Sequence, residues 1–323
     1  MTTTSVKKIN GNFKNKDIIS LDQFTPKDLA ILFKHTKKMK VIGEKGKKSD
    51  LLAGKIVTLL FYEPSSRTFG SFGAAVKQLG GQTIEIVNPQ QFSSVSKGET
   101  FEDTIRTFEA YCDAIVLRDK IAGQAQKAAD AAFFVPIINA GDGIGEHPTQ
   151  ALLDLFTIYE SKGKLDNLTG VLAGDLLNGR TVHSLIRGLS LYKGNTLYLL
   201  SPKELRLSRS DYKKFSESGI KLIEIFDDKD MPKNADFWYW TRVQKERFPS
   251  EAAYEKVKNK FVVTEKLVKE MAGKKTIIMH PLPRVGEIET AVDADPRAVY
   301  LRSEVRNGMY IRMALIALLL GKL

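Results

Sequence analysis

The chain has 323 residues, 43% of them hydrophobic and 27% charged, which favours a soluble globular protein of about two domains. Its formal net charge is +11, yet the lysines are scattered or clustered in polar connectors without interleaved aromatic residues, which disfavours a nucleic-acid-binding surface. The single cysteine, Cys112, excludes an internal disulfide framework and a cysteine-based zinc site, and it suits a reducing cytoplasm.

The N-terminal residues 1–20 are polar and rich in lysine, without the apolar core of a secretory signal. Pro26 fits the first turn of a helix that carries Leu29, Leu32 and Phe33 inward. We therefore expect a cytoplasmic protein with a helix ahead of the first predicted strand.

From about residue 50 onward, apolar runs alternate with segments of helical periodicity. The apolar runs predict strands at 56–61, 83–87, 114–117, 135–139, 170–173, 196–200, 221–225, 237–240 and 276–279. The periodic segments predict helices at 68–79, 99–111, 148–161, 181–192 and 264–271. Because the strands are apolar through their length, we expect an α/β fold of two doubly wound parallel sheets covered on both faces.

Two further features complete the predicted architecture. The helix that begins at Pro148 is the expected crossing between two similar α/β halves. The apolar run Met313–Leu320 is too short to span a bilayer and predicts a C-terminal helix that is buried nearly all round.

The segment Phe61–Thr68 carries the strongest chemical signal. It leads from a predicted strand directly into a predicted helix, and Ser66, Arg67 and Thr68 lie at the junction. Unpaired backbone N–H groups and the helix dipole favour an anion at a helix start. A solvated Arg in the first turn is the plainer interpretation, but the dipole disfavours a cation there unless an anion binds. We therefore predict a site for a phosphate-like anion.

Polar groups follow several other predicted strands at equivalent places. Doubly wound sheets bind ligands outside the carboxyl ends of their strands, so we expect these groups to converge on a cleft. They are Arg67, Arg118, Asn139–Gly143 with His147, Asp175–Arg180, Arg242 and His280–Arg284.

His147 stands at a helix entry, with Pro148 in the favoured first position and Gln150 three residues on. A lone histidine is more often structural than catalytic. Here a neutral imidazole N–H can stabilise negative charge that develops on a carbonyl oxygen. The four histidines include no pair at metal-ligand spacing, so we expect no metal.

Searches for other catalytic motifs find no match. The run Gly141-x-Gly143-x-Gly145 lacks the spacing of a dinucleotide fingerprint, and the chain has no phosphate-binding loop with Gly-Lys-Ser/Thr and no Gly-x-Ser-x-Gly elbow. We therefore expect no cofactor and no acyl-enzyme. An arginine-rich cleft for more than one anionic group predicts transfer from a phosphorylated donor to an anionic acceptor.

Four segments taken together resemble the carbamoyltransferase family, in order along essentially the whole chain. The resemblance is closest to the branch that uses aspartate. The segments are Ser65–Thr68, His147–Gln150, Thr241–Arg247 and His280–Arg284.

The resemblance implies transfer of the carbamoyl group from carbamoyl phosphate to the amine of L-aspartate, an early step of pyrimidine biosynthesis. It implies a carbamoyl-phosphate-binding domain of residues 1–148, completed by a C-terminal helix at 305–323, and an aspartate-binding domain of residues 149–304. It also implies a homotrimer with active sites shared between subunits. Whether a regulatory chain binds stays open.

The resemblance also assigns site residues. Arg67, Thr68, Arg118 and His147 are implied to be catalytic. The residues implied to hold carbamoyl phosphate are Ser65, Ser66, Arg67, Thr68, Arg118, His147, Gln150 and the carbonyls of Leu282 and Pro283. Those implied to hold aspartate are Lys97, Arg180, Arg242 and Gln244.

The chain departs from the family pattern Ser-Thr-Arg-Thr-Arg-x-Ser-Phe-Glu at three places. Ser66 replaces the first Thr and keeps the hydroxyl, Phe69 replaces the second Arg, and Gly73 replaces the Glu. We interpret the last two as the paired removal of an ionic contact. The loop 93–98 holds several serines besides Lys97, so the serine that reaches phosphate is not defined.

Three other functions were weighed. An ornithine-using relative would place Cys where this chain has Pro281 and would need negative groups, whereas Arg180 and Arg242 favour a dicarboxylate acceptor. A nucleic-acid-binding protein is suggested only by the net charge of +11. A non-catalytic scaffold is disfavoured because Arg67, Thr68, Arg118 and His147 are all retained.

Overall fold

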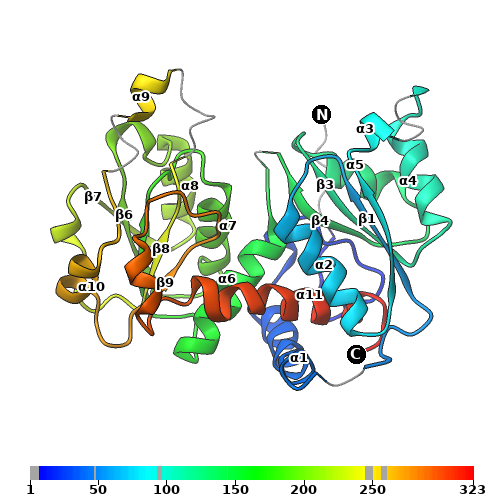
Figure 1. Ribbon diagram of the computed structural model, residues 1–323, viewed down its shortest axis with the longest axis horizontal. Helices are drawn as coiled ribbons and strands as arrows, with labels where there is room; N and C mark the ends of the chain where they lie inside the picture. Colours follow the sequence, from blue (N-terminus) through cyan, green and yellow to red (C-terminus); the bar gives the residue numbers. More distant parts are fainter. Residues whose placement is uncertain (1–6, 47–48, 93–96, 144, 244–249, 256–259) are drawn as a thin grey trace. The chain divides into compact units, whose positions relative to one another are not determined.

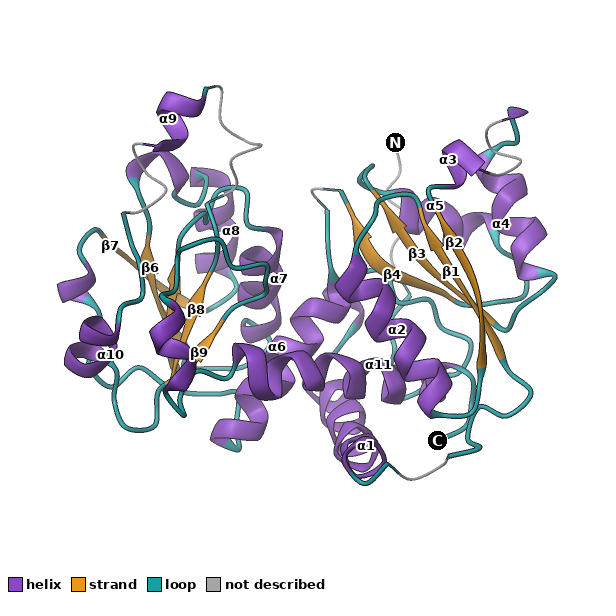
Figure 2. Cartoon of the chain, viewed as in Figure 1, coloured by secondary structure: helices purple, strands orange, loops and turns teal. Residues whose placement is uncertain are grey.

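The structure is a computed structural model that describes residues 7–46, 49–92, 97–143, 145–243, 250–255 and 260–323. The chain divides into two compact units, the first of Met1–Leu153 with Arg306–Leu323 and the second of Asp154–Val305. Each unit is built around its own parallel sheet (Figures 1 and 2).

The sheet of the first unit has four parallel strands in the order β2-β1-β3-β4. Its strands are β1 (Ile56–Phe61), β2 (Gln82–Val87), β3 (Ala114–Asp119) and β4 (Ile137–Asp142). Strand order departs from sequence order at β1, so loops that are distant in the chain meet at the carboxyl ends of adjacent strands.

Helices cover both faces of this sheet, because alternate strand residues point to opposite sides. Leu60 packs with Ile105 and Ala128 under α4 (Phe101–Glu109) and α5 (Gln124–Ala131). Leu59 points to the other face, toward α2 (Ser66–Gln78): a Cβ atom built on Gly73 of that helix would lie 3.8 Å from a Leu59 methyl carbon.

Two further helices belong to the first unit, α1 (Pro26–Glu44) and the short α3 (Pro89–Phe92), and the C-terminal α11 (Val305–Leu319) belongs to it from Arg306 onward. Helix α11 is buried from Tyr310 to Leu319, and the Leu319 carbonyl accepts from Asn15 N at 2.9 Å. This confirms that the apolar C-terminal run forms a buried helix that packs on the first unit. The boundary between the units falls within α6 (Pro148–Lys162).

The second unit has five parallel strands in the order β7-β6-β5-β8-β9. The strands are β5 (Thr169–Ala173), β6 (Thr196–Leu200), β7 (Lys221–Ile225), β8 (Phe237–Trp240) and β9 (Ile277–Met279). The helices are α7 (Arg180–Leu189), α8 (Arg209–Glu217), α9 (Glu251–Glu255) and α10 (Glu265–Met271). Short 3-10 or π turns occur at Leu21–Gln23, Lys203–Leu205, Asp228–Asp230, Thr290–Ala294 and Tyr300–Glu304.

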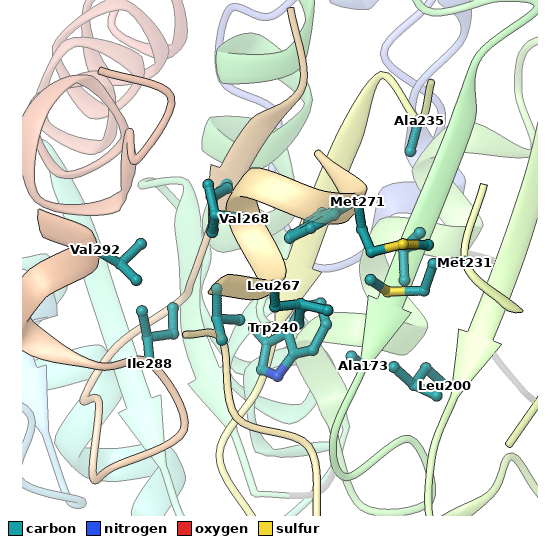
Figure 3. Close-up of a cluster of buried hydrophobic side chains, with 14 of the residues drawn as sticks. Ala173, Leu200, Met231, Ala235, Trp240, Leu267, Val268, Met271, Ile288 and Val292 are labelled. Carbon is teal, nitrogen blue, oxygen red and sulfur yellow. The ribbon is translucent and has the colours of Figure 1, made fainter. Parts of the chain in front are cut away.

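One core of the second unit lies between its sheet and α10 (Figure 3). Trp240 and Ala173 from the strands pack with Leu267, Val268 and Met271 from the helix. Burying these side chains contributes roughly 1.5–3 kcal/mol for each large residue, so this layer stabilises the second unit.

Every predicted strand is present, and the two parallel sheets confirm the predicted fold class. Two strands, β3 and β4, reach further at their carboxyl ends than predicted. Strand β3 continues through Arg118, and β4 continues through Asn139–Asp142, because the backbone pairing of Phe61 with Arg118 and of Asp119 with Asp142 extends beyond the apolar runs. The expectation that these polar residues follow the strands was therefore wrong. They are the last residues of the two strands.

Among the described residues, no helix is both long and apolar enough to cross a membrane.

Candidate functional site

The polar groups predicted at strand ends fall on three adjacent strands in each unit. In the first unit they follow or end β1, β3 and β4, which are neighbours in the sheet. In the second unit they follow β5, β8 and β9, which are neighbours too. Parallel strands put all their carboxyl ends at one edge, so each unit gathers its own polar cluster there.

The start of α2 has the features of an anion site. Ser65 is the N-cap residue, with extended backbone, but its side chain makes no capping hydrogen bond. The first turn holds no acidic side chain, and Ser66 and Arg67 are exposed while Thr68 is buried. The helix start therefore presents hydroxyl groups and a guanidinium together with the positive end of the helix dipole.

Arg118 is only 7% exposed, so its charge needs compensation. Its Nη2 atom lies 2.5 Å from Glu63 Oε2, and its Nη1 atom donates to the Ala140 carbonyl at 3.0 Å. Glu63 follows β1 and the Ala140 carbonyl lies on β4, so the guanidinium is fixed by the strands on either side of β3.

Gly141 lets Arg118 and His147 approach one another. Its φ is +119°, a conformation that favours glycine, and a Cβ atom there would lie 2.6 Å from Arg118 Nη1 and 3.5 Å from His147 Cδ2. Gly141 N donates to Asn139 Oδ1 at 2.8 Å, and Asn139 Nδ2 donates to the Ile19 carbonyl at 3.0 Å. The glycine is thus both required by the space and held by the N-terminal segment.

His147 lies between two threonine hydroxyls and is 5% exposed. Its Nε2 atom is 3.5 Å from Thr68 Oγ1, and its Nδ1 atom is 3.5 Å from Thr149 Oγ1. The preceding residue, Glu146, accepts from Ser20 Oγ at 2.7 Å and from Leu21 N at 3.0 Å. The structure therefore brings Thr68, Arg118 and His147 together, as the strand-end argument predicts for the first unit.

Arg312, from α11, was not anticipated. It is 4% exposed, its Nη1 donates to Ser71 Oγ at 2.9 Å, and its Nη2 donates to Thr149 Oγ1 at 3.3 Å. Its guanidinium carbon also lies 5.0 Å from the centroid of the Phe72 ring. It joins α2 and α6 behind Thr68 and His147, and one Arg inside an apolar helix was the available sequence signal.

In the second unit, Arg180 is the first residue of α7, and Arg242 follows β8 directly; both side chains are half-buried. The strand ends that carry them are held tightly, since Thr241 N donates to the Ala173 carbonyl at 2.9 Å. Gly174 has a φ of +106°, and a Cβ atom there would lie 2.1 Å from the Thr241 carbonyl oxygen. Close approach of β5 and β8 at this edge therefore requires glycine.

The segment after β9 was predicted to contribute to the site, but the pairing of His280 with Glu287 within it was not. His280 is 2% exposed, and its Nε2 atom lies 2.7 Å from Glu287 Oε1. Burial raises the pKa of Glu287, but the hydrogen bond and charge interaction with His280 and backbone N–H groups outweigh it and lower that pKa overall. The bond between Leu282 and Pro283 is cis, and Leu282 has a φ of +56°.

Among the remaining predicted residues, Gln150 contacts the first cluster, because its backbone N–H donates to the His147 carbonyl at 3.0 Å. Gln150 is half-buried in the first turn of α6. Lys97 is exposed near the start of α4. Gln244 and the serines of 93–96 lie outside the described residues.

The structure shows the surroundings of Phe69 and Gly73, the two departures from the family pattern that remove charged residues. The Phe69 ring packs edge-on against Phe61, with centroids 5.2 Å apart. A Cβ atom at Gly73 would meet Glu85 and Leu59 at ordinary contact distances, and Glu85 accepts from Lys77 at 2.8 Å. An apolar contact therefore stands at position 69, and the acidic group near position 73 comes from β2.

The donor set near these clusters favours anions over metals. Among the residues that the structure describes, no group of three His, Cys, Asp or Glu side chains could hold a metal ion. Arginine, hydroxyl and backbone N–H groups bind phosphate and carboxylate oxygens instead.

Comparison with protein families gives two matches that together cover most of the chain. Residues 16–160 match the aspartate/ornithine carbamoyltransferase, carbamoyl-P binding domain. Residues 166–319 match the aspartate/ornithine carbamoyltransferase, Asp/Orn binding domain.

Individual relatives agree with these matches. The aspartate carbamoyltransferase catalytic subunit of Leptospira biflexa is 47% identical over 310 residues, which cover 96% of this chain and 98% of that protein. The multifunctional protein pyr1-3 of Dictyostelium discoideum is 46% identical over 97% of this chain, which spans 14% of that longer protein. The structure of aspartate transcarbamoylase from Trypanosoma cruzi in complex with carbamoyl phosphate and aspartate has a TM-score of 0.86 and 38% identity, over 95% of this chain and 96% of that one.

Proposed function

Because the chain belongs to the aspartate/ornithine carbamoyltransferase family, we propose that it transfers the carbamoyl group of carbamoyl phosphate to the amine of L-aspartate. The products are N-carbamoyl-L-aspartate and phosphate, and the reaction is an early step of pyrimidine biosynthesis. The observation that carries this proposal is the buried group of Thr68, Arg118 and His147 beside the anion-binding start of α2. Relatives named for aspartate, and one solved with both substrates, support the choice of acceptor.

The α2 start is the proposed phosphate cradle. Ser65, Ser66, Arg67 and Thr68 supply hydroxyl, guanidinium and backbone N–H donors where the helix dipole favours negative charge. Arg118 is proposed to bridge a phosphate oxygen and the carbamoyl oxygen, since its planar fork offers two parallel donors. Glu63 then competes with the substrate for this guanidinium.

The carbamoyl group is proposed to bind through both its ends. Thr68, Arg118 and His147 donate to its oxygen, with Gln150 beside them, while the Leu282 and Pro283 carbonyls accept from its amide. When the aspartate nitrogen attacks the carbamoyl carbon, a C–N bond forms and the oxygen becomes negative. Donors already in place stabilise that charge without reorganisation.

The reaction then closes without a side-chain base. The C–O bond to phosphate breaks as the carbonyl reforms, and the departing phosphate takes the proton that the amine loses. This step balances atoms and charge with the two substrates alone. It explains why the proposed site holds donors rather than a histidine–carboxylate base.

The acceptor side is proposed to be cationic. Arg180, Arg242, Gln244 and Lys97 are assigned to the two carboxylates of aspartate, and fixed positive groups select a dicarboxylate over a cationic amine. Arg180 at the start of α7 and Arg242 just after β8 are both half-buried, and the segments that carry them follow the adjacent strands β5 and β8, which supports this role.

At the level of the whole chain, we propose a carbamoyl-phosphate domain of residues 1–148 with 305–323 and an aspartate domain of 149–304. We also propose a cytoplasmic homotrimer in which Lys97 enters a neighbouring subunit's site. The exposure of Lys97 and the family matches to 16–160 and 166–319 support these assignments.

The test of the function is product formation with two acceptors. Purified protein with carbamoyl phosphate should release phosphate rapidly with L-aspartate and far more slowly with L-ornithine, and carbamoyl aspartate should form in equal amount. Preference for L-ornithine would overturn the acceptor assignment, and no phosphate release with either amine would overturn the proposed reaction.

A further inference from the structure

The segment His280–Pro283 directly follows β9. In the proposed function, two of its backbone carbonyls accept hydrogen bonds from the carbamoyl amide. Backbone carbonyls cannot adapt through side-chain rotamers, so their use depends on what fixes the backbone. Three hydrogen bonds of His280 do so, and they come from separate parts of the second unit.

The hydrogen bonds of His280 define its tautomer. Leu282 N donates to His280 Nδ1 at 2.8 Å, and a backbone N–H can only donate, so Nδ1 carries the lone pair. The proton of a neutral ring is then on Nε2, which lies 2.7 Å from Glu287 Oε1 and donates to it. A doubly protonated ring would turn an N–H toward the N–H of Leu282.

Glu287 is itself held in place. Its second oxygen, Oε2, accepts from Val285 N at 2.8 Å. Its carbonyl accepts from Val263 N at 2.9 Å, and the next residue, Ile288, is buried in the core of the second unit (Figure 3). The carboxylate is therefore a fixed acceptor that orients the imidazole.

The backbone of His280 has its own anchor. Its N–H donates at 3.1 Å to Oε2 of Glu304, whose side chain is 2% exposed. Leu282, two residues on, has a φ of +56°, a left-handed conformation that a leucine adopts only where its surroundings impose it. The bond from Leu282 N to the imidazole is one of the contacts that impose it.

We propose that His280, oriented by Glu287, is a positioning residue that aims the Leu282 and Pro283 carbonyls at the carbamoyl amide. The proposal rests on the proposed function. It predicts different effects on the two ends of carbamoyl phosphate, because these carbonyls accept from the carbamoyl amide and do not bind the phosphate group. Loss of the imidazole should therefore weaken binding of carbamoyl phosphate more than binding of inorganic phosphate.

Two substitutions of His280 each keep one of its two ring hydrogen bonds and remove the other. In His280→Asn the amide oxygen takes the place of Nδ1 and can still accept from Leu282 N, whereas the contact with Glu287 is lost. In His280→Gln the amide nitrogen takes the place of Nε2 and can still donate to Glu287, whereas the acceptor for Leu282 N is lost. Glu289→Gln is the control, since Glu289 is an exposed carboxylate in the same loop.

Initial rates give KM for carbamoyl phosphate, KM for aspartate and the inhibition constant of inorganic phosphate. For His280→Gln we expect the KM for carbamoyl phosphate to rise about tenfold, equivalent to about 1.4 kcal/mol, with the phosphate constant within about twofold of wild type. His280→Asn should show a smaller rise, and Glu289→Gln none. An unchanged KM in His280→Gln, or equal weakening of carbamoyl phosphate and phosphate, would overturn the positioning role.

The wild-type protein supplies a second readout that needs no folded variant. In protein with ¹⁵N-labelled histidine, the His280 ring should show a protonated Nε2 and an unprotonated Nδ1. Carbamoyl phosphate should shift these two signals, and inorganic phosphate should not. The opposite tautomer, or identical shifts with both ligands, would contradict the proposal. Failure of the proposed function itself would appear differently, as a wild-type protein that forms no carbamoyl aspartate.

Discussion

At the scale of single residues, the account depends on hydrogen-bond donors that are fixed before the substrate arrives. His147 is the clearest case, because it is 5% exposed and held at the start of α6 between two hydroxyls. A donor in such a place stabilises an oxyanion without having to reorganise.

Replacing His147 with Ala should therefore lower kcat by about 10²-fold or more, the usual cost of removing one such donor. Steady-state rates with saturating substrates measure the effect. The matched control is His35→Ala, a histidine on α1 with no place in the proposed site, which should keep wild-type kcat. Equal loss in both variants would indicate a general effect on folding instead.

A second prediction at the scale of single residues concerns Glu304 and the dependence of folding stability on pH. Burial, and then the neighbouring Asp154, raise the pKa of Glu304 well above its ordinary value, so the fold favours the protonated form of this carboxyl. A raised pKa stabilises the fold fully below the unfolded pKa, and this stabilisation is lost as pH rises toward the folded pKa.

The variant Glu304→Gln carries a neutral group at every pH. Its free energy of unfolding should therefore increase relative to that of the wild type as pH rises from 5 to 8, by at most about 1.4 kcal/mol per pH unit. Urea unfolding at several pH values gives the difference, with exposed Glu289→Gln as control. A difference that stays constant with pH would show that Glu304 does not titrate above its ordinary range.

At the scale of elements, the first unit works because strands and helix starts meet at one edge. Arg118 on β3 and His147 just before α6 both lie close to Gly141 on β4, within 3.5 Å of the place that a Cβ atom there would take. The geometry of the cluster is thus set by backbone as well as by side chains.

Gly141→Ala should separate Arg118 from His147, since the added atom would lie 2.6 Å from Arg118 Nη1 and the φ of +119° disfavours any side chain. We expect carbamoyl phosphate to bind at least about tenfold more weakly, because the bidentate donor moves. Isothermal calorimetry with inorganic phosphate tests the same site without turnover.

The matched glycine is Gly70, which is exposed on α2 and whose Cβ atom would meet nothing within 4 Å. Gly70→Ala should keep the affinity and stabilise the chain by up to about 1 kcal/mol, because alanine favours a helix. If Gly141→Ala binds phosphate as well as Gly70→Ala does, the steric argument is wrong.

Most elements could be predicted from the sequence, for a physical reason. Strands buried on both faces are apolar throughout, so Ile56–Phe61 and Phe237–Trp240 were predicted with their observed bounds. Helix α5 was not predicted, because it buries only small residues such as Ala125 and Ala128. Helix α8 was not predicted either, because Phe215 is its one buried residue.

The candidate site was predictable where chemistry and position coincide in the sequence. Arg67, Thr68, Arg118 and His147 stand at strand ends and carry suitable groups. Glu63 and Gly141 were not identified, since their roles come from contacts with Arg118, which is distant in sequence. Such contacts depend on the order of the strands in the sheet, and the hydrophobic periodicity of the sequence does not define that order.

At the scale of the whole molecule, the account makes the oligomer part of the site. Lys97 is exposed, and it is assigned to a neighbouring subunit's substrate. An active site divided between subunits can be restored by mixing two different inactive chains.

Lys97→Ala and Arg67→Ala should each be nearly inactive as pure proteins. After dissociation and reassembly in equal amounts, random cyclic trimers should regain roughly a quarter of wild-type activity, because about three quarters of them are mixed and each mixed trimer has both native residues at one of its three sites. Rates before and after mixing give the result. Absence of any recovery, with trimers shown by sedimentation, would mean that each subunit supplies its whole site.

The central claim is that cationic groups from separate strand ends serve one pair of anionic reactants. A crystal structure of the protein with carbamoyl phosphate and succinate, a dicarboxylate without an amine, tests it most directly. We predict Arg67, Thr68, Arg118 and His147 on the carbamoyl phosphate, with Arg180 and Arg242 on the succinate carboxylates. Ligands held by other residues, or these arginines turned to bulk solvent, would contradict the account.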